Sequence, residues 1–192
     1  MRLDATQRSA LIAIGYESIE RGLRRGQFAP WPGPPSVAGL EVPAATFTTL
    51  HCDGELRGCC GALEARRPLA EDVWCHAWLS AFADSRFLPL AQHEFAALEL
   101  QVSVLGPLVP LAAASERELL AALRPNEDGL VIQAGASRAT FLPAVWEQLP
   151  DPVEFLRHLK IKAGWTAGDW PAGVRAFRYT TECFGAASRC AA

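Results

Sequence analysis

The chain has 192 residues, of which 50% are apolar and 20% are charged, and its formal net charge is −3. This ordinary globular composition and length suit one domain with a substantial core. No basic run is present, which argues against general electrostatic attraction to nucleic acid or to an anionic membrane. We therefore expect neither as a partner.

The N-terminal sequence MRLDATQRSALIAIG has early charges and lacks a secretory apolar region with a cleavage site. No apolar run approaches the length of a membrane span. These features predict a cytoplasmic protein, whose cysteines are mostly small buried hydrophobes. The six cysteines include no C-x2-C pair, so the spacing predicts no metal site and no cofactor. They are Cys52, Cys59, Cys60, Cys75, Cys183 and Cys190.

The first half of the chain alternates helical and extended patterns. Residues 5–25 form an amphipathic pattern, and residues 29–43, with five prolines, predict a surface loop. Two strand-like runs then flank Asp53-Gly54, a strong hairpin signal. Pro68 begins a helix that is apolar on nearly every side, and LELQVSVL predicts a strand ended by Gly106-Pro107.

The second half repeats this order. A short helix is predicted from Ser115 to Leu123, followed by strands GLVIQA and RATFL and a short helix in PAVWEQL. A longer helix begins at the Asp151-Pro152 cap and ends at Gly164, and VRAFRYTTECF predicts one last strand. Strand, turn, strand, proline-started helix and closing strand thus occur in residues 45–105 and again in 129–184, which indicates a duplicated unit. The hairpins favour an α+β fold with antiparallel pairing.

The stretch ELRGCCG, residues 55–61, is the most unusual in the chain. A two-residue turn at Asp53-Gly54 would pair Cys52 with Glu55, Leu50 with Arg57, Thr48 with Cys59 and Phe47 with Cys60. Because side chains alternate across a strand, Arg57 and Cys59 would then share one face, and Cys60 would lie in the core. A guanidinium near the Cys59 sulfur would favour the reactive thiolate.

Two alternatives remain for these residues. Most free cysteines in sheets are inert, and glycines such as Gly58 and Gly61 often mark only a bulge, although they also leave room for a ligand to approach the backbone. A Cys-His catalytic pair is less favoured. The same strand pairing puts His51 on the face opposite Cys59, and His76 lies in a helix that is predicted to be buried.

Lys160 and Lys162 lie at a helix C-terminus, where lysines complement the helix dipole. The tryptophans do not alternate with basic residues, so they form no nucleic-acid platform.

Several stretches together resemble the AMMECR domain family. Its hallmark LRGCIG box stands here as Leu56-Arg57-Gly58-Cys59-Cys60-Gly61, with Cys60 in place of the usual isoleucine. FTTL, RRPLAEDV, AFADSRFLPL, LELQVSVLGPL, RATFLPAVWEQLP and LKIKAG are also similar. The resemblance runs over residues 6–184 and implies a single domain spanning 1–192, with residues 185–192 as a frayed tail. It also implies that the two β-rich units are gathered into one curved, mainly antiparallel sheet with flanking helices.

The resemblance implies two kinds of partner, a MEMO-like relative of extradiol dioxygenases and a radical S-adenosylmethionine enzyme. The chain itself lacks the CxxxCxxC motif of the latter. The resemblance implies no established biochemical role for the LRGCIG box.

Three hypotheses follow. In the first, the protein is a binding or accessory module that holds a small molecule or a modified residue at the box. Its expected binding residues are Leu56, Arg57, Gly58, Cys59, Gly61, Thr48, Thr49, Asp84 and Arg86. In the second, it is an enzyme whose nucleophile or redox thiol is Cys59, activated by Arg57. In the third, it is a structural protein–protein adaptor, in which Arg57 is held in a salt bridge and Cys59 is inaccessible.

Overall fold

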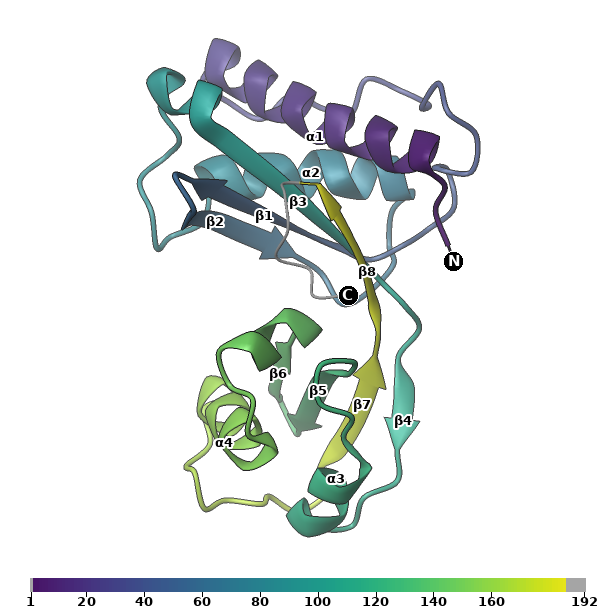
Figure 1. The fold of residues 1–192 in the computed structure, drawn as a ribbon, viewed down its shortest axis with the longest axis vertical. Coiled ribbons are helices and arrows are strands. Elements are labelled where there is room, and N and C mark those ends of the chain that lie inside the picture. The colour runs from purple at the N-terminus through teal and green to yellow at the C-terminus, as the bar shows by residue number, and fades with distance from the viewer. Residues whose placement is uncertain (1, 186–192) are drawn as a thin grey trace. The chain divides into compact units, whose positions relative to one another are not determined.

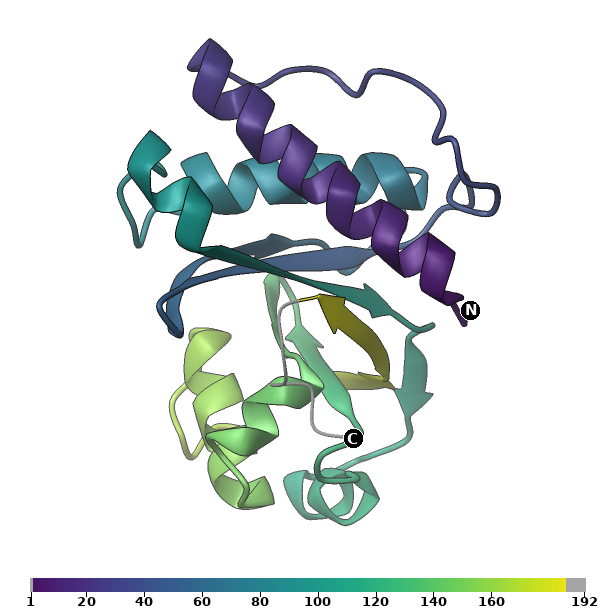
Figure 2. The same cartoon turned by 45° about the horizontal axis from the view of Figure 1, so that its top comes forward.

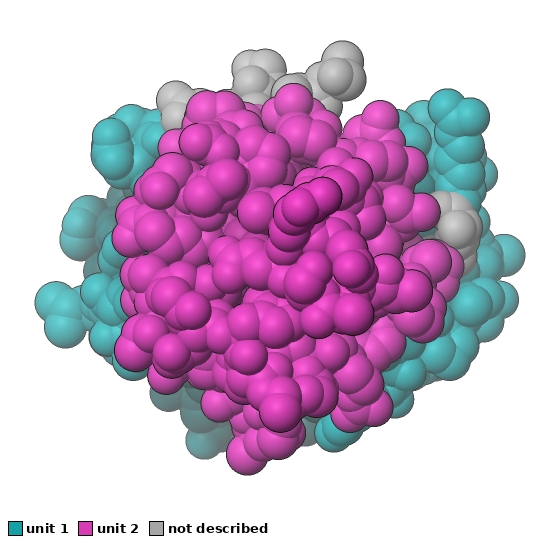
Figure 3. Space-filling model, turned by 90° about the horizontal axis from the view of Figure 1, so that it is seen from below, with its two compact units in different colours: residues 1–105, 182–188 teal, residues 106–181, 189–192 magenta. Residues whose placement is uncertain are grey.

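The computed structural model describes residues 2–185 and divides the chain into two compact units (Figures 1 and 3). Among the described residues, the first unit comprises 2–105 and 182–185, and the second comprises 106–181. Each unit has its own buried apolar cluster and its own four-stranded sheet. The expected frayed tail lies outside the described residues, apart from Gly185 at the end of the last strand.

The first unit packs two helices on one face of its sheet (Figures 1 and 2). Asp4 caps the first helix by accepting the Gln7 backbone N–H, and the last turn ends at Gly26 in the left-handed conformation. The elements are α1 (Ala5–Arg25), β1 (Thr46–Cys52), β2 (Glu55–Gly61), α2 (Leu69–Phe82), the 3-10 helix η1 (Gln92–Ala97), β3 (Leu98–Leu105) and β8 (Thr181–Gly185).

The second unit packs its helices around a stacked aromatic pair, Trp146 and Phe155, whose ring centroids are 3.8 Å apart. Its elements are β4 (Val109–Leu111), α3 (Glu116–Ala122), β5 (Gly129–Ala134), β6 (Ser137–Phe141), the 3-10 helix η2 (Pro143–Glu147), α4 (Pro152–Lys162) and β7 (Arg175–Tyr179). Pro110 is tolerated in β4 because that strand lies at the edge of its sheet.

The two sheets have the same topology. The strand orders are β2-β1-β3-β8 and β6-β5-β7-β4, so the first strand of each hairpin lies between its hairpin partner and the closing strand. This arrangement confirms the α+β class and the two related units. The fourth strand of each sheet comes directly after the closing strand of the other, since β4 follows β3 and β8 follows β7.

The expectation of one curved sheet is therefore wrong, and so is that of one last strand in VRAFRYTTECF. The chain leaves the extended strand conformation at two places. Gly106-Pro107 separates β3 from β4, where the proline has no N–H to donate, and Thr180 separates β7 from β8. A single hydrogen bond from the Gly106 N–H to the Thr180 carbonyl, 2.8 Å long, joins these two break points.

His76 is a buried core histidine, as the sequence suggested, and its partners are polar. Asp72 accepts hydrogen bonds from the backbone and the hydroxyl of Thr46, at 3.0 and 2.7 Å, and lies 3.1 Å from His76 Nδ1. All three residues are at most 3% exposed. Lys160 is also fully buried, where it donates to Glu116 at 2.8 Å, so its side chain serves packing between α3 and α4 rather than the helix dipole alone.

Replacing Asp4 with Ala tests the first cap. We expect the free energy of unfolding to fall by about 1 kcal/mol, because the Gln7 N–H loses its acceptor and water replaces it incompletely. Urea-induced unfolding, followed by far-ultraviolet circular dichroism, measures the change. Asp53→Ala is no suitable control, because Asp53 has a positive φ, so Glu41→Ala in an exposed loop serves instead.

Candidate functional site

The hairpin that carries the box contains a β-bulge at Arg57. Cys52 pairs with Glu55 as expected, and His51 pairs with Leu56, but Leu50 pairs with Gly58. Arg57 is thus an extra residue in β2, and every pair beyond it is shifted by one. The expected pairs of Leu50 with Arg57, Thr48 with Cys59 and Phe47 with Cys60 are therefore wrong.

The shift separates the predicted site residues onto two faces. We call the face of this sheet that packs on α1 and α2 the inner face, and the opposite one the outer face. Thr48 and Leu50 are fully buried on the inner face, and Cys60 pairs with Thr48 there. Cys59 pairs with Thr49 on the outer face. Cys60 thus lies on the inner face, but it is half-buried rather than part of the buried core as expected, and burial raises the pKa of its thiol.

Arg57 binds Glu94 rather than Cys59. Its Nε and Nη2 donate to the two carboxylate oxygens at 2.6 and 2.9 Å, and the two side chains are only 14% and 21% exposed. The carboxylate also accepts the Ala91 N–H at 2.8 Å. The bonds from Arg57 and then from Ala91 lower the pKa of Glu94 to about 2, and the same pair with Glu94 raises the pKa of Arg57.

Asp84 binds the backbone of the box. It lies ten residues before Glu94, at the other end of the loop that follows α2. Its Oδ2 accepts the Cys59 N–H at 2.9 Å and a bond from Arg86 Nη2 at 2.7 Å. The carboxylate is 7% exposed. Mainly through the Arg86 guanidinium, the pKa of Asp84 is held well below its usual range. The sequence-based inclusion of Asp84 and Arg86 near Cys59 thus agrees with the geometry.

Phe87 lies between these two ion pairs. Its ring centroid is 5.9 Å from the Arg57 guanidinium carbon and 5.5 Å from that of Arg86. Two carboxylates and one aromatic ring, spaced along residues 84–94, therefore attach this loop to the box. Sequence reasoning missed Phe87 and Glu94. The only signal for them was that Phe87 lies in the family-like stretch AFADSRFLPL.

Close packing explains why both Gly58 and Gly61 of the box are glycines. A Cβ on Gly58 would overlap the carbonyl oxygen of Ser80 in α2, and one on Gly61 would overlap the ring of Phe47. The space beside each glycine is thus occupied by the protein itself. The interpretation that they leave room for a ligand is wrong at both positions, because close approach of β2 to α2 and to its own partner strand takes that room.

Cys59 is half-buried, and its sulfur accepts a hydrogen bond from the Thr49 hydroxyl at 3.5 Å. Burial, followed by the charge of the Glu94 carboxylate, raises the pKa of the Cys52 thiol. His51 lies on the outer face with Thr49, since both alternate with inner Leu50. The expectation that His51 and Cys59 occupy opposite faces is wrong, but no hydrogen bond joins them in residues 2–185.

The predicted site residues thus fall into three groups. Cys59, Thr49, Asp84 and Arg86 come together near the middle of the hairpin, and Leu56 lies on the same outer face with 41% of its surface exposed. Arg57, Gly58 and Gly61 are taken up by contacts within the protein. Thr48 is buried on the inner face and cannot share a ligand with Cys59.

Removing the Asp84 carboxylate tests its hold on the box. We expect Asp84→Ala to lower the free energy of unfolding by about 1.5 kcal/mol, because the Cys59 N–H loses a charged acceptor and Arg86 loses its partner. Urea-induced unfolding measures this. Glu55→Ala, an exposed position in the same hairpin, should change stability little; an equal loss in both variants would contradict the role of Asp84.

Within the described part of the chain, no group of three or more His, Cys, Asp or Glu side chains is arranged to hold a metal ion. The same residues contain no helix that is long and apolar enough to cross a bilayer. The described cysteines are all free, including the neighbouring pair Cys59 and Cys60, whose side chains point to opposite faces.

Comparison with known proteins identifies the family of this chain. A family model described as AMMECR1 matches residues 12–184. This chain belongs to the AMMECR1 family. A protein of Thermofilum pendens is 30% identical over 95% of this chain and 91% of its own, and Protein MJ0810 of Methanocaldococcus jannaschii is 36% identical over 72% and 71%.

An AMMECR1-like fold is also found among solved structures. The crystal structure of an uncharacterized protein, PH0010 from Pyrococcus horikoshii, matches with a TM-score of 0.82 and 28% identity, over 90% of this chain and 88% of that one. AMMECR1 membership and the fold are therefore shown by the family model and by structure. The contacts described above assign packing roles to half of the AMMECR1 box in this chain, namely Arg57, Gly58 and Gly61.

Proposed function

We propose that this AMMECR1-family protein is a binding or accessory module, and that its LRGCCG box displays Cys59 and Leu56 on the outer face for a partner or a small ligand. The observation that carries this proposal is the bidentate ion pair between Arg57 and Glu94. In this ion pair the Arg57 guanidinium holds the loop, whereas an enzyme would need it beside the Cys59 thiolate.

Rigidity of the displayed surface supports the same function. Asp84 holds the Cys59 backbone, Ser80 blocks movement of Gly58 toward α2, and Phe87 is bracketed by two guanidinium groups. A site whose supporting residues are fixed before binding loses less conformational entropy when its partner arrives. The partners that fit the family are a MEMO-like protein and a radical S-adenosylmethionine enzyme.

Binding to these partners can be tested with two exposed leucines. Leu56 is 41% exposed on the hairpin, and Leu88 is 84% exposed on a loop. The purified MEMO-like and radical S-adenosylmethionine proteins from the genome that encodes this chain are titrated, by biolayer interferometry, against the wild type, Leu56→Asp and Leu88→Asp. We expect Leu56→Asp to weaken binding at least tenfold, since a charge would replace a desolvated apolar contact.

The matched variant controls for the added charge, so Leu88→Asp should bind within twofold of the wild type. Equal weakening by both substitutions would contradict a site at the box. Absence of binding by the wild type to both proteins would remove them as partners. A screen of small metabolites by thermal shift, with Leu56→Asp as the control, then tests the small-ligand form of the proposal.

The enzyme alternative is favoured by one observation, the shared outer face of His51 and Cys59. Alkylation of the native protein across a pH series, followed by mass spectrometry at each cysteine, separates the two functions. If the protein is a binding module, we expect Cys59 to be alkylated without a fast phase below pH 7. We also expect His51→Gln to change the alkylation rate of Cys59 by less than twofold. Burial raises the pKa of Cys60 and Cys75, which serve as slow internal references.

A fast reaction of Cys59 below pH 7 that is lost in His51→Gln would identify an activated thiol and overturn the binding function in favour of catalysis. The structural adaptor hypothesis is partly met, because Arg57 is in a salt bridge, but its second condition requires an inaccessible Cys59. Half-burial of that residue argues against it.

A further inference from the structure

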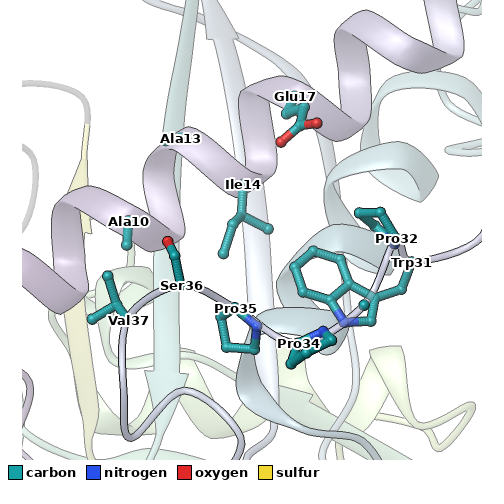
Figure 4. A pocket seen from close by; sticks show the side chains of 11 residues that line it. Ala10, Ala13, Ile14, Glu17, Trp31, Pro32, Pro34, Pro35, Ser36 and Val37 are labelled. Atoms are coloured by element: carbon teal, nitrogen blue, oxygen red, sulfur yellow. The ribbon is translucent and has the colours of Figure 1, made fainter.

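A cavity of about 420 Å³ lies between α1 and the proline-rich segment of residues 31–37 (Figure 4). It shares no residue with the LRGCCG box. The helix contributes side chains from one stripe, Ala10, Ala13, Ile14 and Glu17, and two of these are alanines that leave space beside the loop. This volume is within the range of sites for small molecules.

The polar lining of the cavity includes one carboxylate. Pro32, Pro34 and Pro35 contribute no backbone N–H to it. Glu17 is the charged residue among the described lining residues, and its carboxylate points from the helix toward the loop (Figure 4). Arg21 binds the Oε1 atom at 2.5 Å, while no hydrogen bond to the other oxygen is found in the described chain. This second oxygen is the lining group that attracts a positively charged ligand.

The aromatic wall fits the same ligand class. The indole of Trp31 stands at one end of the cavity (Figure 4) and is fixed edge-to-face against Trp74, with ring centroids 5.4 Å apart. The neighbouring Trp74 ring already contacts a cation, since the guanidinium of Arg21 lies 5.3 Å from its centroid. Indole faces bind cations better than the other aromatic side chains do.

We propose that this cavity binds the cationic head of an alkylammonium compound, either free or carried on a lysine-type side chain. The ammonium group would lie between the free oxygen of Glu17 and the indole of Trp31, and its alkyl part would contact Ala10, Ala13 and Ile14. Charge attraction and the aromatic face provide the binding energy, and the small residues provide the room.

Choline and its neutral isostere, 3,3-dimethylbutan-1-ol, test the need for charge. Each is titrated into the full-length ¹⁵N-labelled protein while the indole N–H signals of the six tryptophans are recorded. The Trp31 signal is assigned from its loss in Trp31→Phe. We expect choline to shift the Trp31 signal saturably, and the alcohol to bind at least about fivefold more weakly, because it lacks the charge but has the same shape.

Two variants on α1 provide the matched comparison. Glu17→Gln should weaken choline binding about fivefold, because it neutralises the carboxylate and leaves Arg21 unpaired beside the ligand. Glu20→Gln removes the similar pair of Glu20 with Arg24 on the same helix, outside the cavity, and should leave binding unchanged. Equal binding of choline and the alcohol, or equal effects of the two substitutions, would overturn the proposal.

The source of the cation is decided by a second probe. A short peptide with a central trimethyllysine is compared with the same peptide carrying norleucine. A shift of the Trp31 signal by choline indicates a free ligand, and a shift by the trimethyllysine peptide alone indicates a cation presented on a protein chain. If neither probe shifts the signal, the cavity does not bind this class of cation and the proposal is wrong.

Discussion

Substitution of Gly58 by Ala is expected to lower the free energy of unfolding by about 3 kcal/mol, because the added methyl group has no space. Its Cβ would overlap the carbonyl oxygen of Ser80, and also crowd the Ser80 carbonyl carbon, so backbone rather than a movable side chain opposes it. Relief would require β2 to move away from α2, against the hydrogen bonds that Thr49 and Asp84 make to Cys59.

Urea-induced unfolding of Gly58→Ala and Gly168→Ala measures this effect with a matched control. Gly168 has open space around its Cα and no positive φ, so alanine should be tolerated there within about 0.5 kcal/mol. A midpoint for Gly58→Ala equal to that of the control would show that β2 and α2 do not pack as described. It would also restore the interpretation that the glycine leaves room for a ligand.

The Arg57–Glu94 ion pair should make the stability of the protein sensitive to acid. Its carboxyl has a pKa of about 2 in the folded protein, against an ordinary value of 4.5. A folded pKa below the unfolded one stabilises the fold above the unfolded pKa, and this contribution is lost as the pH falls. We therefore expect stability to decline between about pH 5 and pH 2.

Glu94→Gln tests the pair directly. At pH 7 we expect a loss of about 2–3 kcal/mol, because the guanidinium stays largely buried without a counter-charge. The wild type and Glu94→Gln should converge as the pH approaches 2, since protonation removes the same charge. Urea midpoints at several pH values measure both effects. Glu20→Gln, in an exposed pair, should change stability by less than about 0.5 kcal/mol.

A double variant separates the pair from simple packing. Arg57→Met combined with Glu94→Met removes both charges and keeps apolar volume, so it should cost less stability than Glu94→Gln alone. If the loss of the double variant relative to the wild type instead equals the sum of the losses in Arg57→Met and Glu94→Met, the two side chains do not act as a pair.

The elements of the fold were largely predictable because each has a local signal. The amphipathic pattern of residues 5–25, the Asp53-Gly54 turn and the Asp151-Pro152 start of α4 were all read from neighbouring residues and agree with the structure. The duplicated order of elements was also readable. The missed strand β4 is short and contains Pro110, and only its partner β7 makes it a strand.

The site was predicted less well, because its geometry depends on one residue of register. The face of a strand is set by a period of two, so the bulge at Arg57 moved Cys59 to the side of Thr49 and His51. Gly58 was read as a possible mark of a bulge, but nothing in ELRGCCG fixes which residue is the extra one. The side chain that draws Arg57 away, Glu94, lies 37 residues further along the chain.

Local patterns were thus enough to identify the helices, the hairpins, the family and the presence of a special box, since hydrophobic period, caps and turns act over a few residues. The division into two sheets, the packing of Gly58 on Ser80 and the binding of Arg57 to Glu94 all depend on groups that are distant in the chain. Such contacts form only when the chain closes on itself, and they determine which side of the hairpin Cys59 faces.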